Sequence, residues 1–223
     1  MSTKPIIVVA GFTREVRTVE GPGIVAIAGG GVAARLEQAL QEAAAAGASG
    51  IISYGLTGGL AEGLRIGDWI VGDRLTGAID HDCHAGWRDA IAASLPGARV
   101  GTFFADGRMI DTIAEKRALG ERHRALAVDM ESHVAAKVAR AYDLPFAIVR
   151  IVSDEVGHLL PHAITVSMRP DGGFSRVAMR QSLADDPAQM RDVTQTMVQF
   201  ATGFRGLRRG ARLLGDRLAF PAT

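Results

Sequence analysis

Short apolar segments alternate with helical patterns along this chain, and that alternation most limits what the chain can fold into. The segments rich in apolar and β-favouring residues are Ile6–Ala10, Ile24–Ala28, Gly50–Tyr54, Trp69–Gly72, Arg99–Phe104, Leu126–Met130 and Phe146–Val152. Most are continuous apolar runs, which is typical of strands that are covered on both faces. Helical patterns lie between them at Val32–Ala46, Asp111–Gly120 and Glu131–Tyr142. The order predicts a layered α/β fold with a mainly parallel or mixed sheet.

The chain of 223 residues suits one large α/β domain. Such a chain buries roughly 70% of its unfolded surface, so its core needs no metal or disulfide. A single cysteine, Cys83, excludes an internal disulfide framework and fits a reducing compartment. The formal net charge of +1 argues against a bulk nucleic-acid binder. We expect no secretory signal and no integral membrane segment, because Ile6–Ala10 is short and glycines interrupt the uncharged stretch Ala43–Ala61.

A glycine run, Gly29–Gly31, follows the second apolar segment and, with Ala34, formally matches G-x-G-x-x-A. Its backbone N–H groups could hold a phosphate or a sugar hydroxyl. A dinucleotide site also needs an acidic residue at the end of the next strand, and Ile51–Tyr54 ends without one. NAD binding is therefore disfavoured, and tight packing of strand on helix is the simpler interpretation.

Four separated regions combine polar residues with predicted strands. They are Gly11–Val16, Ser53–Leu60 with Leu64–Val71, Ala127–Ser132 and Pro145–Asp154. In their order and spacing, these regions resemble the purine nucleoside phosphorylase and 5′-methylthioadenosine/S-adenosylhomocysteine nucleosidase superfamily, over roughly residues 5–156. The resemblance implies a three-layer α/β fold with a central mixed, mostly parallel sheet flanked by helices. It also implies an enzyme that breaks the N-glycosidic bond of a purine nucleoside.

Asp154 ends an otherwise apolar predicted strand. Burial favours the neutral form of a carboxyl group, which would keep a proton available near neutral pH. A purine leaves readily only after a ring nitrogen is protonated, and general acid assistance typically gives about 10²–10⁴ in rate. The resemblance implies that Asp154 protonates the adenine N7, with Ser153 beside it. The alternative interpretation is that Asp154 caps the following helix.

Glu131 is the second carboxylate of interest, since one ionised carboxylate can accept hydrogen bonds from two ribose hydroxyls at once. The resemblance implies this role for Glu131, with Met130 packed on the sugar. Glu131 would also favour a helix N-terminus through the macrodipole, which is compatible with ribose binding.

By the same resemblance, Glu15 positions or activates the attacking water, and Met109 and Ile110 enclose the base. A solvated loop carboxylate is the competing interpretation of Glu15. Leu56 joins the expected substrate-binding residues.

The nucleophile decides between phosphorolysis and hydrolysis. Some phosphorylases of the superfamily use an Arg and a Ser where this chain has Ser53 and Leu56. Gly30, Thr57 and Arg14 are the candidates for another phosphate site. No cofactor is expected, with phosphate a possible co-substrate.

The segment Asp80–His84 contains His, Cys and Asp, which are all metal-ligand types, but its spacing matches no closed structural zinc site. We interpret it as a surface loop and assign no metal.

The C-terminal segment concentrates positive charge. Residues 200–223 contain five Arg and one Asp, a net +4, so the other 199 residues carry a net −3. The segment also has an apolar stripe at helical spacing: Phe200, Phe204, Leu207, Ala211, Leu214 and Leu218. We therefore divide the domain into a catalytic part, residues 1–199, and a basic amphipathic helix, residues 200–223. Such a helix suits an anionic membrane surface, and a packed terminal helix with a solvated Arg face is the alternative.

This segment and the apolar loop Gly157–Pro161 make the chain look like the hopanoid-associated phosphorylase branch, whose members remove adenine from adenosylhopane. The expected partner is thus a small, lipid-linked nucleoside, with peripheral membrane contact through residues 200–220. We further expect a homodimer or larger homo-oligomer in the cytoplasm, at the inner face of the membrane. The alternatives are a soluble purine nucleoside phosphorylase or methylthioadenosine/S-adenosylhomocysteine nucleosidase, and a non-catalytic, membrane-associated nucleoside-binding module.

Overall fold

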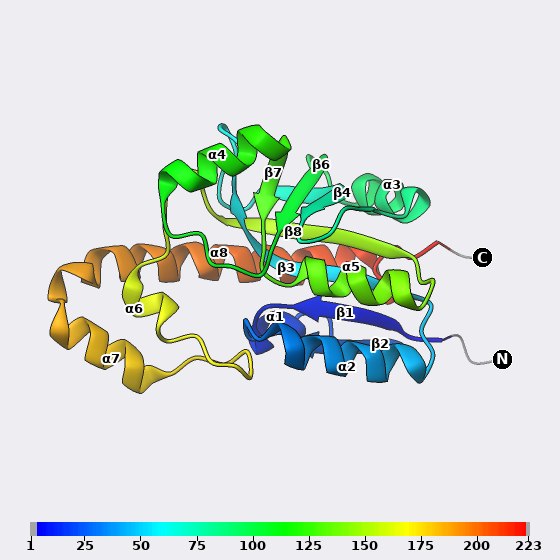
Figure 1. Cartoon of the computed structure of the whole chain (residues 1–223), viewed down its shortest axis with the longest axis horizontal. Coiled ribbons are helices and arrows are strands. Elements are labelled where there is room, and N and C mark those ends of the chain that lie inside the picture. The colour runs from blue at the N-terminus through cyan, green and yellow to red at the C-terminus, as the bar shows by residue number, and fades with distance from the viewer. Residues whose placement is uncertain (1–3, 222–223) are drawn as a thin grey trace.

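The computed structural model describes residues 4–221, whose eight strands form one mixed sheet (Figure 1). The strands are β1 (Ile6–Ala10), β2 (Ile24–Ala28), β3 (Gly50–Gly59), β4 (Trp69–Gly77), β5 (His81–Asp82), β6 (Arg99–Ala105), β7 (Ala125–Val128) and β8 (Phe146–Asp154). The helices are α1 (Thr13–Val16), α2 (Ala33–Ala45), α3 (Ala85–Ser94), α4 (Ile113–His123), α5 (Ser132–Ala141), α6 (His162–Thr165), α7 (Arg176–Asp185), the 3-10 helix η1 (Pro187–Gln189) and α8 (Met190–Leu214). The predicted α/β fold with a mixed sheet flanked by helices is confirmed.

Five of the strands close into a ring. The strand β3 pairs with β7 and β8, β8 also pairs with β4, β4 with β6, and β6 with β7. The first half of β3 carries an extension as well, because it pairs in parallel with β1, which pairs in parallel with β2. Since β1, β2, β3 and β8 all run in one direction, their carboxyl ends meet at one end of the sheet, where ligands of such folds bind.

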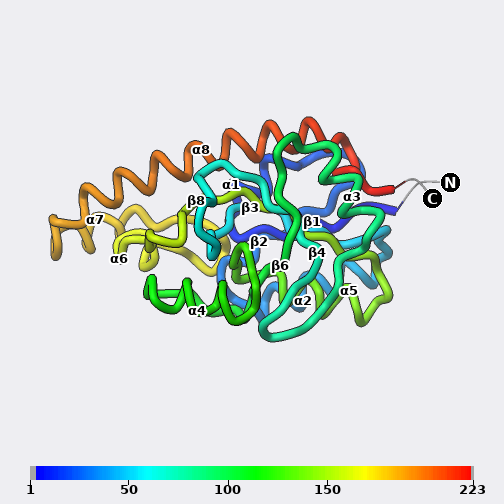
Figure 2. Tube along the Cα trace, turned by 90° about the horizontal axis from the view of Figure 1, so that it is seen from above, coloured from blue at the N-terminus to red at the C-terminus, as the bar shows by residue number. Residues whose placement is uncertain are grey.

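Helices cover both faces of the sheet, as Figures 1 and 2 show from two directions. On one face lie α2 and α5, and the four-residue spacing of Leu36, Leu40 and Ala44 turns the apolar side of α2 onto the strands. On the other face lie α1, α3 and α8. Every side chain of β1 is fully buried between these layers, which explains why its sequence is continuously apolar.

The structure extends several predicted elements. The strand β3 runs to Gly59, so the glycines after Tyr54 are strand residues and not a loop. The strand β7 ends at Val128 and leaves Asp129–Glu131 outside the sheet, where their side chains are free to form a site. Three helices were not predicted, namely α1, α3 and α6. Asp186 accepts a hydrogen bond from the Ala188 backbone N–H and begins η1, as its position before Pro187 predicts.

The C-terminal helix differs from its predicted extent, because α8 begins at Met190 and ends at Leu214. Its apolar stripe faces the sheet: Phe200, Phe204 and Leu207 are all buried in the core. The structure thus supports the packed terminal helix, and the stripe is not available as a membrane-binding face. Within residues 4–221, no helix has both the length and the apolar character to cross a membrane.

Glycines in α8 allow this close packing. A Cβ added at Gly210 would lie 2.4 Å from a ring carbon of Trp69, and one at Gly203 would lie 2.5 Å from a methyl group of Leu56. The glycines that weaken the helix by propensity therefore admit side chains of β3 and β4.

Candidate active site

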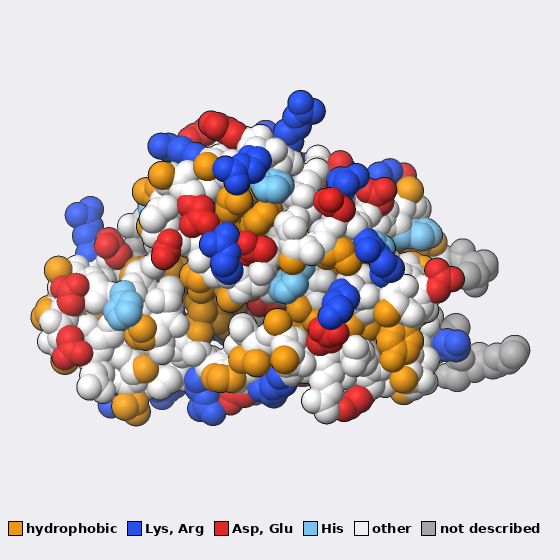
Figure 3. Space-filling view, in the orientation of Figure 1, with side chains coloured by type: hydrophobic (Ala, Val, Ile, Leu, Met, Phe, Trp, Pro, Cys, Tyr) orange, Lys and Arg blue, Asp and Glu red, His pale blue; other side chains and the backbone are white. Residues whose placement is uncertain are grey.

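A cavity of about 290 Å³ lies where the carboxyl ends of β1, β2 and β8 meet, beside the second half of β3. In the space-filling view this face of the molecule is hollowed between α4, the α6–α7 region and the start of α2, and hydrophobic side chains form much of the floor (Figure 3). The loop after β8 contributes His158, Leu159 and Leu160 to the wall, as its apolar sequence suggested.

The cavity brings together nearly all of the predicted site residues. Those that line it are Glu15, Gly30, Leu56, Thr57, Met109, Ile110, Met130, Glu131, Ser153 and Asp154. Arg14 is the exception, since its guanidinium carbon lies 4.4 Å from the centre of the Phe204 ring, outside this cavity. Arg14 lines the adjoining groove and does not contribute to this cavity. Adjacent residues of a helical turn point in different directions, and in α1 Glu15 points inward while Arg14 points away.

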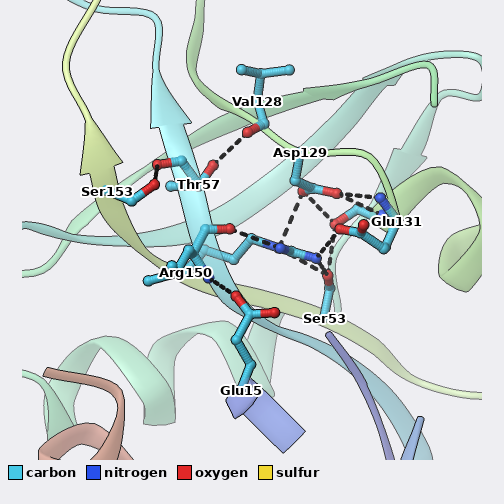
Figure 4. Close-up of polar contacts among 10 residues, drawn as sticks. Glu15, Ser53, Thr57, Val128, Asp129, Glu131, Arg150 and Ser153 are labelled. Atoms are coloured by element: carbon cyan, nitrogen blue, oxygen red, sulfur yellow. Dashed lines mark hydrogen bonds and ion pairs between the residues drawn. The ribbon is translucent and has the colours of Figure 1, made fainter. Parts of the chain in front are cut away.

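Arg150 organises one end of the cavity (Figure 4). It lies on β8 with 1% of its side chain exposed, and Nη2 donates to Oε2 of Glu131 at 3.2 Å. Its Nε lies 3.3 Å from Oδ2 of Asp129. Further hydrogen bonds run from Nη1 to the Leu56 carbonyl at 2.8 Å and from Nη2 to the Ser53 hydroxyl at 2.7 Å. One buried cation thus holds two buried carboxylates and fixes its own position through β3.

Glu15 is buried at the same end of the cavity, so the alternative of a solvated loop carboxylate is wrong. Its Oε1 accepts from the Leu56 backbone N–H and its Oε2 from the Phe12 backbone N–H, both at 2.6 Å. Burial raises the pKa of Glu15, and the Arg150 charge and these N–H groups only partly offset that effect. A Cβ on Gly55 would lie 2.7 Å from Oε1, so this strand glycine makes room for the carboxylate.

Glu131 faces Glu15 across Gly11, at which an added Cβ would lie 3.3 Å from a carboxylate oxygen of each. Burial raises the pKa of Glu131 to about 7; Arg150 lowers it, while the charges of Asp129 and Glu15 raise it further. Asp129 holds the start of α5, because its Oδ1 accepts from the backbone N–H groups of Glu131 and Ser132. The two carboxylates therefore form a buried acidic corner with Arg150 as its counter-charge.

Asp154 lines the same cavity from the end of β8, but it is not the isolated carboxyl group that the sequence suggested. Nζ of Lys116, a residue of α4, lies 2.7 Å from its Oδ2, and the two side chains are 3% and 13% exposed. The Ser153 hydroxyl is 2.9 Å from Oδ1. Asp154 is thus one partner of a buried ion pair with Lys116, a contact that the sequence did not predict.

The segment before α4 closes the cavity over this carboxylate. Asp106 accepts from the Arg108 backbone N–H at 3.0 Å and pairs with the Arg108 side chain at 2.8 Å, which shapes the turn that presents Met109 and Ile110. Met109, Ile110 and Val128 give this part of the wall an apolar surface, which suits a flat heterocyclic base.

The two remaining candidates for a phosphate site are Gly30 and Thr57, and their polar groups are already used. The Gly30 backbone N–H donates to the Gly11 carbonyl at 3.0 Å, and the Thr57 hydroxyl donates to the Val128 carbonyl at 2.7 Å. The polar end of the cavity therefore offers one guanidinium against the carboxylates of Glu15, Asp129 and Glu131, a charge balance that disfavours a phosphate dianion.

The segment Asp80–His84 lies away from this cavity, and within the interpreted loop two residues form a short strand. His81 and Asp82 form β5, and His84 caps α3 by accepting from the Trp87 backbone N–H at 3.1 Å. Across residues 4–221, the structure contains no cluster of three or more His, Cys, Asp or Glu side chains that could hold a metal ion.

Sequence reasoning did not single out three residues of this site: Arg150, Asp129 and Lys116. A signal existed for Arg150, because it is the charged residue inside the apolar run Phe146–Val152, and a buried cation requires a carboxylate partner. No such signal existed for Lys116, because it lies in a polar helix and its hydrogen-bond partners are in residues 154–158, far away in the sequence.

Comparisons with known proteins agree with this geometry. Residues 83–182 match the model of the Phosphorylase superfamily. No curated protein matches the chain in sequence. At 13–16% identity, the solved structures described next establish the shared fold.

The 5′-methylthioadenosine/S-adenosylhomocysteine nucleosidase of Neisseria meningitidis, in complex with methylthio-immucillin-A, is similar with a TM-score of 0.68 and 15% identity, over 97% of this chain and 99% of that one. The futalosine hydrolase of Helicobacter pylori is similar with a TM-score of 0.67 and 13% sequence identity, over 97% of each chain. The 5′-methylthioadenosine/S-adenosylhomocysteine nucleosidase of S. pneumoniae, with a transition-state inhibitor, is similar with a TM-score of 0.62 and 16% sequence identity, over 89% of this chain and 99% of that one.

Proposed function

We propose that the chain is an enzyme of the phosphorylase superfamily, whose model residues 83–182 match, and that it cleaves the N-glycosidic bond of an adenine nucleoside and releases adenine. The observation that carries this proposal is the arrangement of three carboxylates in one cavity. Glu15 and Glu131 lie together at the buried polar end, and Asp154 lies beside the apolar wall of Met109, Ile110 and Val128. A ribose fits the polar end and a purine fits the apolar end, with the scissile bond between them.

Each carboxylate has a distinct task in the proposed reaction. Glu131 accepts hydrogen bonds from the ribose hydroxyls, with Met130 against the sugar. Asp154 delivers a proton to the purine, so that the electrons of the C–N bond move onto a neutral leaving group. Glu15, whose pKa is raised by burial, takes a proton from the water that attacks the sugar carbon. Arg150 keeps Glu131 in place.

We propose hydrolysis in preference to phosphorolysis. The polar end of the cavity holds Arg150 among three carboxylates, and this excess of negative charge would repel phosphate, whereas it does not repel a neutral water molecule. Burial raises the pKa of Glu15, so this carboxylate can accept a proton from that water as it attacks.

The test is to incubate the protein with adenosine, 5′-methylthioadenosine and S-adenosylhomocysteine, with and without phosphate, and to identify the sugar product. Free sugar in both conditions agrees with the proposal. A sugar 1-phosphate that forms only with phosphate would show phosphorolysis instead.

For the natural substrate we propose a nucleoside with an apolar group at the ribose 5′ carbon, such as adenosylhopane in hopanoid lipid biosynthesis. A second groove of about 910 Å³ adjoins the cavity, and Phe12 and Phe200 line both. The floor of this groove is apolar, with Phe174, Met179 and Met197 among its residues. An apolar 5′ group that passes Phe12 and Phe200 would be removed from water there.

Adenosines with 5′-alkyl groups of increasing length test this substrate class. Each methylene that enters the groove contributes up to about 0.8 kcal/mol, or about fourfold in kcat/KM. Met197 lines the groove but not the cavity, and it is 44% exposed, so Met197→Lys offers a matched control. The variant should cleave adenosine normally and lose the preference for long chains. A kcat/KM that does not change with chain length would favour a soluble nucleoside such as 5′-methylthioadenosine.

A membrane role, if the substrate is lipid-linked, belongs to the outer face of α8. Arg205, Arg208 and Arg209 remain outside the buried stripe, and we propose that they are the contact with anionic lipid. Binding to anionic vesicles should fall when all three are changed to Gln. We also propose a homo-oligomer, which sedimentation analysis tests directly.

A further inference from the structure

Lys116 is a buried lysine that contacts the proposed acid, and the reaction scheme above does not use it. The whole residue is 2% exposed. Its Nζ donates to Oδ2 of Asp154 at 2.7 Å, to the Glu155 carbonyl at 2.8 Å and to the His158 carbonyl at 3.0 Å. An ammonium group has three N–H donors, and here all three are used. The buried ammonium is therefore fully hydrogen-bonded, to one carboxylate and two carbonyl oxygens.

Asp154 receives hydrogen-bonding groups on both of its oxygens. The ammonium of Lys116 lies on Oδ2, and the Ser153 hydroxyl donates to Oδ1 at 2.9 Å. Both oxygens of Asp154 thus accept hydrogen bonds, and its contact with Lys116 is an ion pair, in which the carboxyl group is the anionic partner. Such a group has no proton to give a purine. The acid step of the proposed reaction therefore needs a neighbour that supplies one, and Lys116 is the contacting group with an acidic proton.

We propose that Lys116 supplies the proton that Asp154 passes to the leaving base, an inference that rests on the proposed nucleoside cleavage. The bound base excludes water from Asp154, and loss of water disfavours the two separated charges. A proton then moves from Nζ to Oδ2 and leaves a neutral amine beside a neutral carboxyl group. Asp154 gives its proton to a purine ring nitrogen as the C–N bond breaks and its electron pair moves onto the base. After the products leave, the amine takes a proton from water.

In this series of proton transfers, Lys116 acts through Asp154 and is therefore a positioning residue. Its role determines how the rate of base release depends on pH. Wild-type protein keeps a transferable proton until the lysine itself loses its charge, so base release continues into alkaline solution. With Lys116→Met, the proton is held by Asp154 alone and is lost at lower pH. Other charged or titratable side chains line the same cavity: Glu15, Arg108, Asp129, Glu131, Arg150, His158 and Arg169. His158→Gln is therefore included, because an imidazole titrates in the range of interest.

The experiment measures the pH profile of adenine release for wild type, Lys116→Met, Lys116→Arg and a control. We expect the alkaline limit of activity to move down by at least about one pH unit in Lys116→Met, so that its loss relative to wild type grows above the new limit and reaches about tenfold above the wild-type limit. Lys116→Arg keeps the positive charge but does not release its proton, so it should fold, bind nucleoside and lose base release. Lys137→Met is the matched control, because Lys137 pairs with Glu37 at 2.7 Å on a side chain that is 62% exposed; its profile should not move.

Three outcomes would overturn the inference. An alkaline limit that moves to higher pH in Lys116→Met would mean that the lysine only makes Asp154 more acidic. A rate lowered equally at all pH values would mean a structural role. Full activity of Lys116→Arg would show that charge alone suffices. His158→Gln should leave the limit in place, and a limit that moves with His158 would transfer the role to the imidazole.

A second measurement separates this inference from the proposed function. If wild-type protein releases adenine from no nucleoside, the proposed function fails, and carboxyl ¹³C NMR still tests the pair. The Asp154 signal, assigned with Asp154→Asn, should stay that of a carboxylate from about pH 5 to about pH 9 in wild type and take up a proton in that range only in Lys116→Met. Identical titration in both proteins would contradict the pairing itself. Circular dichroism and thermal unfolding verify that each variant is folded.

Discussion

Replacement of Arg150 by Met should destabilise the protein far more than the same change at a surface arginine with the same number of ion pairs. Arg150 contacts Asp129 and Glu131, and the three side chains are 1%, 2% and 8% exposed. Removal of one partner from a buried ion pair costs about 3–5 kcal/mol, because the remaining charges stay out of water without a counter-charge. A domain of ordinary stability has only about 5–15 kcal/mol to lose.

Arg74 provides the matched control. It pairs with Asp80 at 3.5 Å and with Asp82 at 3.4 Å, but its side chain is 50% exposed and its partners are 65% and 79% exposed. Exposed pairs contribute at most about 1 kcal/mol, so Arg74→Met should change the free energy of unfolding by no more than that. Both variants have the same substitution and lose two ion pairs each; they differ in burial and in the hydrogen bonds that Arg150 also donates to Ser53 and Leu56.

Urea unfolding of wild type and both variants, at pH 7.5 and pH 5, measures these free energies. The loss of unfolding free energy in Arg150→Met should shrink at the lower pH, because burial raises the pKa of Glu131 to about 7 and also raises that of Glu15, so that proton uptake removes buried negative charge that has lost its guanidinium partner. If the free energy of unfolding falls in Arg150→Met by an amount within about 1 kcal/mol of the fall in Arg74→Met, Arg150 does not hold the acidic corner together.

Two further predictions concern stability. Burial raises the pKa of Glu131 to about 7 in the folded protein, against 4.5 for an ordinary glutamate, so its contribution to stability is fully present below about pH 4.5 and is lost as the pH rises through 7. Glu131→Gln should therefore raise the melting temperature relative to wild type more at pH 8 than at pH 4. A difference in melting temperature that is constant with pH would contradict this. Gly210→Ala should lower the free energy of unfolding by about 1–3 kcal/mol, because the added Cβ would lie 2.4 Å from the Trp69 ring. The control Gly157→Ala, whose Cβ would have no atom within 4 Å, should stay within about 0.5 kcal/mol of wild type. Equal free energies of unfolding for the two variants would exclude close packing of α8 on β4.

The sequence was sufficient for the architecture and for most of the cavity wall because both depend on order along the chain. Continuous apolar runs identify buried strands whatever their neighbours are, and parallel strands bring their carboxyl ends together. Glu15, Glu131 and Asp154 follow or end such strands, so their convergence was predictable.

What could not be predicted depends on contacts between elements distant in sequence. Nothing near Lys116 indicates that residues 154–158 enclose its ammonium, and this contact changes the expected charge of Asp154. Likewise, an apolar stripe on a helix predicts that one face of the helix is buried, but either a membrane or a protein core can cover that face. The stripe of α8 is buried because β3, β4 and β8 leave one face of the sheet uncovered for it.

The central claim is that Asp154 delivers the proton that releases the base, and Asp154→Asn tests it most directly. Adenine release and nucleoside binding should be measured on the same preparations, with Asp192→Asn, an exposed residue of α8, as the control. The account predicts that Asp154→Asn still binds the nucleoside and releases adenine about 10²–10⁴ times more slowly, while Asp192→Asn is unchanged. Release at the wild-type rate by Asp154→Asn would contradict the account.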